Sequence, residues 1–247
     1  ERKAILLGNA AAHHAKASNL LALANWIGEQ TGATVGYLTE AANTVGAQLA
    51  GAVPRAGGLN AGQMLAGGVK AAILLNTEPE FDSVAGKAAV AALAKAEMVV
   101  TLSPFKANLD CSDVLLPIAP FTETPGTFVN AEGRVQSFHA VVKPLGEARP
   151  AWKVLRVLGN MLGLPGFDFE SSRDVLTAVR GPQDVDQAFV QGPRLDNSTS
   201  AAIDLAPAAG RPATAAIYQL DGIVRRAPSL QLTADARQGA AAQGVTA

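Results

Sequence analysis

Short apolar runs alternate with stretches of helical periodicity through the first half of the chain. The run Lys3–Leu7 closes at Gly8, and residues 15–30 then repeat apolar side chains at the spacing of an amphipathic helix. Gly32 predicts the end of that helix, and a second apolar run covers 33–38. Because a strand, a helix and a strand in this order form a parallel unit, the pattern predicts a parallel sheet.

The same alternation continues to Pro117. It predicts further strands and helices: strands at 71–75, 98–102 and 114–116, and helices at 61–66 and 84–95. Residues 40–62 are rich in Gly, Asn and Pro, which predicts a long irregular loop. Continuous apolar strands of this kind are expected where helices cover both faces of a sheet. The sequence therefore predicts an α/β fold, a Rossmann-like parallel sheet with helices on both faces.

A β-hairpin is predicted after the last strand of this sheet. Residues 127–130 and 134–138 alternate apolar and polar side chains on either side of a turn that contains Gly133. Helical spacing returns at 152–162, and again in a short helix that begins near Ser171. Beyond these helices the periodicity fades, which predicts a partly irregular C-terminal extension.

These patterns predict three consecutive regions. An α/β domain should cover 1–165, an extension that packs on it should cover 166–233, and an Ala, Gln and Gly-rich tail at 234–247 should be disordered. The chain opens at Glu1 without a methionine or a signal pattern, so we expect it to be a piece of a longer protein.

Charge and cysteine content exclude several classes of function. Twenty basic and twenty-one acidic residues give a net charge of −1 with no basic block, so no nucleic acid partner is expected. The apolar stretches are broken by Lys70, Lys95 or Glu97 before they could cross a bilayer, so direct membrane insertion is not expected. An iron–sulfur cluster normally needs about four thiolates, and this chain has only Cys111.

Candidate catalytic and metal-binding patterns are weak. His13 and His14 are adjacent and would point in different directions, so no metal site is expected. The Gly8 turn lacks the later glycines of a dinucleotide fingerprint, which favours a plain tight turn. Ser103 has no evident base partner and Cys111 has no nearby histidine, so no catalytic residue is predicted.

The loops that follow two of the predicted strands are better placed for a ligand. Residues 76–79 follow one strand and residues 103–106 follow the next. Open α/β sheets bind ligands at such strand ends. The same prolines, Pro79 and Pro104, could also simply end the strands, and position alone leaves both interpretations open.

Several segments resemble the molybdopterin oxidoreductase family, and within it the large iron–sulfur subunit of bacterial NADH:quinone oxidoreductase (respiratory complex I). The most specific stretches are 113–117, 121–136, 144–150 and 152–158, with further matches at 43–54 and 221–231. The resemblance is to the C-terminal part of that subunit. It covers nearly the whole chain and is weakest at 181–215.

In such enzymes strand-end loops form the pocket for a pterin dinucleotide. The resemblance therefore marks Asn76, Glu78, Ser103 and Asp113 as positions of a vestigial pocket. Residues 76–79 read Asn-Thr-Glu-Pro where molybdenum enzymes commonly have a Gly-Asn-Pro type of turn, and the carboxylate of Glu78 would repel a pyrophosphate. The resemblance thus implies a fold that was kept after the molybdopterin was lost.

The first hypothesis is a non-catalytic structural domain of an oxidoreductase subunit. The resemblance implies iron–sulfur clusters in the full-length subunit and partners among its N-terminal cluster domains and the other peripheral-arm subunits, with the hairpin at 127–138 as a contact. It also implies a location on the cytoplasmic side of the bacterial inner membrane.

Two other hypotheses come from cofactor-binding classes. One is the pterin-dinucleotide domain of a working molybdenum oxidoreductase. The other is an unrelated nucleotide-binding module that uses the Gly8 turn. Molybdenum, pterin or nucleotide bound to the full-length protein would distinguish them from the structural domain.

Overall fold

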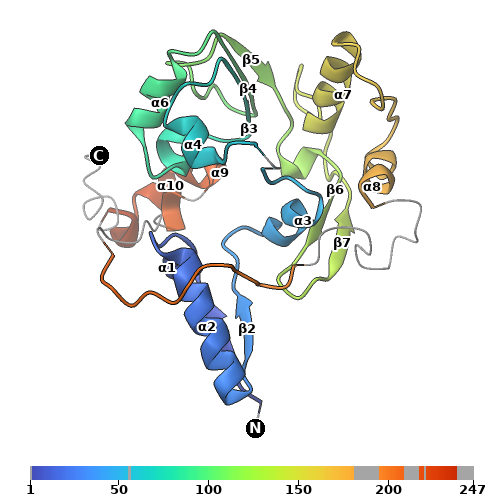
Figure 1. Cartoon of the computed structure of the whole chain (residues 1–247). Coiled ribbons are helices and arrows are strands. Elements are labelled where there is room, and N and C mark those ends of the chain that lie inside the picture. The colour runs from blue at the N-terminus through green and yellow to red at the C-terminus, as the bar shows by residue number, and fades with distance from the viewer. Residues whose placement is uncertain (1, 55–56, 181–194, 209–216, 220, 238–247) are drawn as a thin grey trace. The chain divides into compact units, whose positions relative to one another are not determined.

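The computed structural model describes residues 2–54, 57–180, 195–208, 217–219 and 221–237 and shows a mixed α/β protein (Figure 1). The chain forms two compact units, each built from separated stretches of sequence. Unit 1 comprises Glu1–Val53, Thr124–Val141 and Arg156–Thr214, and unit 2 comprises Pro54–Glu123, Val142–Leu155 and Ala215–Ala247. The stretches of the two units alternate along the chain.

Each unit has its own helices and strands. Those of unit 1 are β1 (Ala4–Leu7), α1 (Asn9–Ala12), α2 (Ala17–Thr31), β2 (Thr34–Tyr37), α3 (Thr44–Leu49), β6 (Gly126–Val129), β7 (Val135–Phe138) and α8 (Ser172–Arg180). Those of unit 2 are α4 (Ala61–Leu65), β3 (Ala71–Leu75), α5 (Pro79–Asp82), α6 (Lys87–Leu93), β4 (Met98–Ser103), β5 (Val114–Pro117), η1 (Phe121–Glu123), η2 (Ile217–Gln219), α9 (Gly222–Arg225) and α10 (Pro228–Gln231). Helix α7 (Ala151–Met161) starts in a stretch of unit 2 and ends in one of unit 1.

Unit 1 opens with the predicted strand, helix and strand. β1 pairs with β2 in parallel, and α2 ends at Gly32, whose φ of 70° is the left-handed conformation expected at a helix end. The prediction of a long irregular loop at 40–62 is wrong, because the structure places α3 and the start of α4 within this range. Pattern alone missed α3 because it is one of the shorter helices and contains Gly46, which lowers helix propensity.

The predicted hairpin is confirmed in unit 1. β6 and β7 pair antiparallel, and the turn between them is held by Asn130, whose Oδ1 accepts from the N–H of Arg134 at 2.9 Å. Phe128 and Phe138 meet edge to face with ring centroids 5.0 Å apart. The side chain of Asn43, just before α3, accepts from the N–H of Val129 at 2.8 Å and so fastens α3 to the hairpin.

The sheet of unit 2 has the order β3-β4-β5 and all its strands are parallel. Helices α4 and α6 lie against one face, where Leu74, Leu93 and Val99 form a buried core with Cys111 (Figure 1). On the opposite face Ile73 stays half-exposed.

The predicted α/β class, with parallel strands and a β-hairpin, is confirmed. The described strands form two separate parallel sheets, β1-β2 and β3-β4-β5, where the sequence predicts a single one. Between β2 and β3 the chain contains α3 and α4 in place of the single crossover helix that usually joins neighbouring parallel strands.

The C-terminal end of the described chain is only partly irregular. Asp221 is the N-cap of α9, and α10 begins at Pro228. Ala236, which falls in the tail predicted from 234 onward, is buried. The rest of that predicted tail, 238–247, lies outside the described residues.

Candidate functional site

Three of the four sequence-predicted site residues meet at the carboxyl ends of the strands of unit 2. Asn76 follows β3, Ser103 is the last residue of β4, and Glu78 precedes α5. All three line one cavity of about 160 Å³, together with side chains of α5, α9 and the loops that follow β4 and β5. The strand-end loops therefore form a pocket, as their position in an α/β sheet predicts.

Local hydrogen bonds fix each of these loops. Asn76 has a φ of 49°, a left-handed conformation that asparagine tolerates, and its N–H donates to the carbonyl of Leu102 at 2.8 Å. The N–H of Glu78 donates to Oδ2 of Asp82 at 2.7 Å, which closes the first turn of α5. The N–H of Phe105 donates to Oγ of Ser103 at 3.1 Å.

Two arginines from the distant α9 segment bind the carboxylates of these loops. The carboxylate of Glu78 accepts from Nη1 and Nη2 of Arg226 at 2.8 and 2.9 Å, a bidentate pair between residues 148 positions apart. Nη2 of Arg225 donates to Asp82, and its Nη1 lies 3.4 Å from Oε1 of Glu78. We call Glu78, Asp82, Arg225 and Arg226 the arginine–carboxylate cluster.

Burial and aromatic stacking strengthen the cluster. The side chains of Glu78 and Arg225 are only 12% and 6% exposed, whereas that of Arg226 is 35% exposed. The guanidinium of Arg226 lies 4.3 Å from the ring centre of Phe105, and that of Arg225 lies 5.0 Å from the ring centre of Phe81. The hydrogen bonds to Glu78 raise the pKa of Arg226 above its ordinary value, so this side chain stays charged.

Asp221 and Gly222, which precede the two arginines, allow α9 to lie close to Glu78. Oδ1 of Asp221 accepts from the N–H groups of Ile223 and Val224 and so caps α9. A Cβ atom on Gly222 would lie 3.0 Å from Oε1 of Glu78 and 3.3 Å from the ring of Phe105. A glycine at this position therefore lets α9 come close enough for the arginine–carboxylate cluster to form.

The charges at this pocket disfavour an anionic ligand. Glu78, Asp82 and Asp221 line the pocket with three negative charges and Arg225 with one positive charge, which leaves a net −2. Arg226, which pairs with Glu78 beside the pocket, offsets one of these charges. Both guanidinium groups already contact carboxylates of the same chain. The volume of about 160 Å³ is also below the roughly 300 Å³ at which ligand pockets usually begin. These residues do not fit a cofactor that carries a pyrophosphate.

The structure does not bring Asp113 to this pocket. Its Oδ2 accepts from the N–H of Val99 at 2.7 Å, and its own N–H donates to the carbonyl of Val99 at 2.9 Å. Asp113 precedes β5 and Val99 is near the start of β4, so this pair lies at the amino ends of the strands. The role that the structure gives to Asp113 is to hold the first residues of β4.

Cys111 lies close to the same end of the sheet. It belongs to the buried core, and burial raises the pKa of its thiol, with the charges of Asp110 and Asp113 acting in the same direction. The thiol is therefore kept neutral.

The remaining candidates of unit 1 have local structural roles. Nε2 of His13 lies 2.7 Å from Oε2 of Glu40, and Nδ1 of His14 accepts from the N–H of Lys16. At the start of α1, the N–H groups of Ala11 and Ala12 donate to the carbonyl of Gly8. Among the residues that the structure describes, no group of three or more His, Cys, Asp and Glu side chains is arranged to hold a metal ion.

The described helices are all too short or too polar to span a membrane.

Parallel sheets with a pocket at the carboxyl ends of the strands place this chain in the α/β class. Residues 5–161 match the family model described as molybdopterin oxidoreductase, and the chain belongs to that family.

Relatives in this family align over short segments. A Staphylococcus aureus protein that bears the formate dehydrogenase name is 46% identical over 52 residues, or 21% of this chain and 5% of its own length. The Bacillus subtilis oxidoreductase YjgC is 40% identical over 65 residues, or 26% of this chain and 6% of its own length. The chain thus matches only a small part of these relatives.

Proposed function

We propose that this chain is the C-terminal part of the large iron–sulfur subunit of NADH:quinone oxidoreductase and serves there as a non-catalytic structural domain. The intact subunit would pass electrons from NADH oxidation along iron–sulfur clusters towards quinone. The clusters would be bound by other parts of the subunit, because this chain has one cysteine and that cysteine is buried in the core of unit 2.

The arginine–carboxylate cluster is the observation that carries the non-catalytic part of this proposal, and the resemblance of the sequence supports the assignment to NADH:quinone oxidoreductase. A dinucleotide at the strand ends would have to bring its pyrophosphate beside Glu78 and Asp82 and compete with them for Arg225 and Arg226. Removing one partner of a buried ion pair typically costs about 3–5 kcal/mol, which the ligand would have to offset. The cluster therefore favours a fold that uses its own side chains where a cofactor would bind.

Its partners would be the cluster-bearing domains of the same subunit and the other peripheral-arm subunits, on the cytoplasmic side of the bacterial inner membrane. The hairpin β6–β7 is a candidate contact, because its Phe128 is 37% exposed although it packs on Phe138. Purification of the full-length protein from solubilised membranes should bring NADH:quinone oxidoreductase activity with it.

Metal and cofactor analysis of the purified full-length protein tests the proposal. Iron, molybdenum and extracted pterin are quantified per protein chain, and a molybdenum enzyme from the same host is processed in parallel to prove recovery. Iron without molybdenum or pterin is expected. Stoichiometric molybdenum and pterin would overturn the proposal.

The family and its relatives support a second candidate function. The family description and the relatives named formate dehydrogenase favour the pterin-dinucleotide domain of a working molybdenum oxidoreductase. In that case the guanidinium groups of Arg225 and Arg226 would turn from Glu78 and Asp82 to the phosphates of the ligand. Neutralising variants such as Glu78→Gln would then raise the pterin content, whereas a structural cluster predicts no pterin in either protein.

A further inference from the structure

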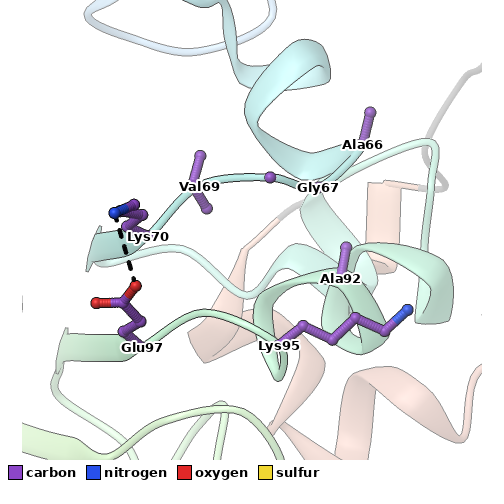
Figure 2. Close-up of a pocket in the computed structure, with 8 residues that line it drawn as sticks. Ala66, Gly67, Val69, Lys70, Ala92, Lys95 and Glu97 are labelled. Atoms are coloured by element: carbon purple, nitrogen blue, oxygen red, sulfur yellow. Dashed lines mark ion pairs between the residues drawn. The ribbon is translucent and has the colours of Figure 1, made fainter.

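The larger cavity of unit 2 is an open surface of small and exposed side chains. It has a volume of about 450 Å³ and is lined by residues 66–70 together with Ala92, Lys95 and Glu97 (Figure 2). Lys70 already pairs with Glu97 at 3.9 Å, and the two side chains are 86% and 76% exposed. This cavity therefore points to no ligand.

In unit 1, a segment without helix or strand, residues 195–206, crosses α2 and reaches β2 (Figure 1). We call this segment the strap. Nδ2 of Asn19 donates to the carbonyl of Ala202 at 2.8 Å, and Nδ2 of Asn25 donates to the carbonyl of Asn197 at 3.0 Å. Side chains of α2 therefore bind the main chain of the strap.

Asn197 joins the strap to the edge of β2. Its Nδ2 donates to the carbonyl of Val35 at 3.3 Å, while its own carbonyl accepts from Asn25. Its φ of 53° is left-handed, a conformation that asparagine adopts more readily than most residues. Oδ1 of Asp196 accepts from the N–H of Ser198 at 3.0 Å and so closes the turn around it. This turn presents a side-chain donor to the backbone of a strand.

Val35 belongs to the outer edge of β2. In the parallel pair with β1, residues 34 and 38 donate their N–H groups to carbonyls of the β1 segment. Because successive residues of a strand point their backbone groups to opposite sides, those of Val35 and Tyr37 point away from β1. In the described part of the chain, the N–H of Val35 and both backbone groups of Tyr37 have no hydrogen-bond partner. Such an edge is a template for another strand.

One face of this two-stranded sheet is apolar and open. Leu6 and Leu38 lie on the same face as Gly36, because alternate residues share a face and Leu6 is in register with Gly36. Their side chains are 58% and 57% exposed. A Cβ atom on Gly36 would meet only the side chain of Leu6, at 3.7 Å. A strand added beside β2 would therefore bury apolar surface as well as satisfy backbone groups.

We propose that the strap is an edge cap that keeps the outer edge of β2 from pairing with β2 of a second copy of this chain. The edge is self-complementary. In an antiparallel pair with a two-fold axis at Gly36, Val35 of each copy faces Tyr37 of the other, and every outward N–H meets a carbonyl. Asn197 occupies the carbonyl of Val35, which is one of these acceptors. The strap has to leave before the two sheets can join. This inference concerns unit 1 alone and is independent of the proposed function.

Removing the edge cap from the full chain tests this inference. The variant N25A/N197A loses the hydrogen bonds that hold this part of the strap to α2 and β2. Its molar mass, measured by light scattering after size exclusion, should rise from that of one chain towards that of two as the protein concentration increases. The amide of Tyr37 should then exchange about tenfold more slowly than in the parent, because most molecules have it paired.

The amides of residues 34 and 38, which are paired to β1, show whether unit 1 stays folded. If N25A/N197A loses their protection, Asn197→Gly replaces it. Glycine keeps the left-handed backbone and removes only the side-chain donor, so the same dimer is expected.

Two substitutions at Val35 decide whether the edge forms the dimer. Val35→Pro removes the N–H that points away from β1 and leaves the ladder to β1 intact, so N25A/N197A/V35P should return to a single chain. Val35→Ala keeps that N–H, so the corresponding triple variant should stay dimeric. Asn160→Ala replaces an exposed asparagine of α7 and is the matched control, which should have the mass of one chain.

A folded variant without the edge cap that keeps the mass of one chain and a fast-exchanging Tyr37 amide would overturn the proposal. So would a dimer that persists with Val35→Pro, because it would use another surface. A parent chain that already pairs through this edge would show that the strap does not cap it.

Discussion

Neutralising Glu78 should destabilise unit 2 far more than neutralising an exposed glutamate. Glu78→Gln keeps the shape of the side chain but removes the charge that faces Arg225 and Arg226. Breaking a buried ion pair costs about 3–5 kcal/mol. Arg226 is 35% exposed and can turn to water, and Arg225 keeps its contact with Asp82, so we expect about 2–3 kcal/mol.

Two other variants provide values with which the loss of stability in Glu78→Gln can be compared. Arg226→Gln should cost about 1–2 kcal/mol, because Glu78 keeps Arg225 at 3.4 Å and the lost side chain is partly solvated. Glu97→Gln removes an equivalent charge from the exposed pair with Lys70 and should cost less than about 0.5 kcal/mol.

Urea unfolding followed by tryptophan fluorescence measures these differences. The two tryptophans of the chain fall in different units, Trp26 in unit 1 and Trp152 in unit 2. In a Trp26→Phe background the fluorescence comes from Trp152, which lies in the part of α7 that belongs to unit 2. With an m-value of about 2 kcal/mol/M, Glu78→Gln should lower the midpoint by about 1 M.

An equal shift of the midpoint in Glu78→Gln and Glu97→Gln would refute the reasoning. It would mean that the arginine–carboxylate cluster contributes no more to stability than an ordinary surface pair. A double-mutant cycle with Arg226→Gln adds a second criterion, because residues in contact should show non-additive losses.

Three further outcomes are expected. Gly159→Ala should lower the melting temperature, because its Cβ would lie 2.4 Å from the ring of Phe167 and overpacking costs about 1–3 kcal/mol. The thiol of Cys111 should be alkylated with a midpoint pH above that in urea, because burial raises its pKa; equal profiles would contradict this. Hydrogen bonds from the backbone of residues 170 and 171 lower the pKa of Asp174, so Asp174→Asn should lose stability above about pH 4 and match the parent in stronger acid, as measured by melting against pH.

The sequence predicts the elements of this fold better than their grouping. Apolar periodicity and turn residues act over a few positions, so the strands, α2 and the hairpin with its Gly133 turn lie where the pattern indicates. The division into two sheets depends on how distant segments pack, which local periodicity does not contain. For the same reason, local periodicity does not indicate that the two compact units are built from alternating stretches of the chain.

The candidate site shows the same limit. Asn76, Glu78 and Ser103 could be placed together because each lies at or just after the carboxyl end of a parallel strand. Asp113 directly precedes a strand, and that order alone indicates the opposite edge of the sheet. Sequence reasoning misses Arg225 and Arg226 as site residues although they lie in the stretch 221–231, because their partner Glu78 is remote in sequence.

The 148 positions between Glu78 and Arg226 also set an order of events during synthesis. The ribosome has to add 148 residues after Glu78 before its carboxylate can meet this guanidinium partner. Until then, a nascent unit 2 holds that charge without Arg226, and its sheet lacks the α9 segment. Products that terminate before residue 226 should therefore be cleared by proteolysis, and unit 2 should reach its folded state only after the α9 segment has emerged from the ribosome.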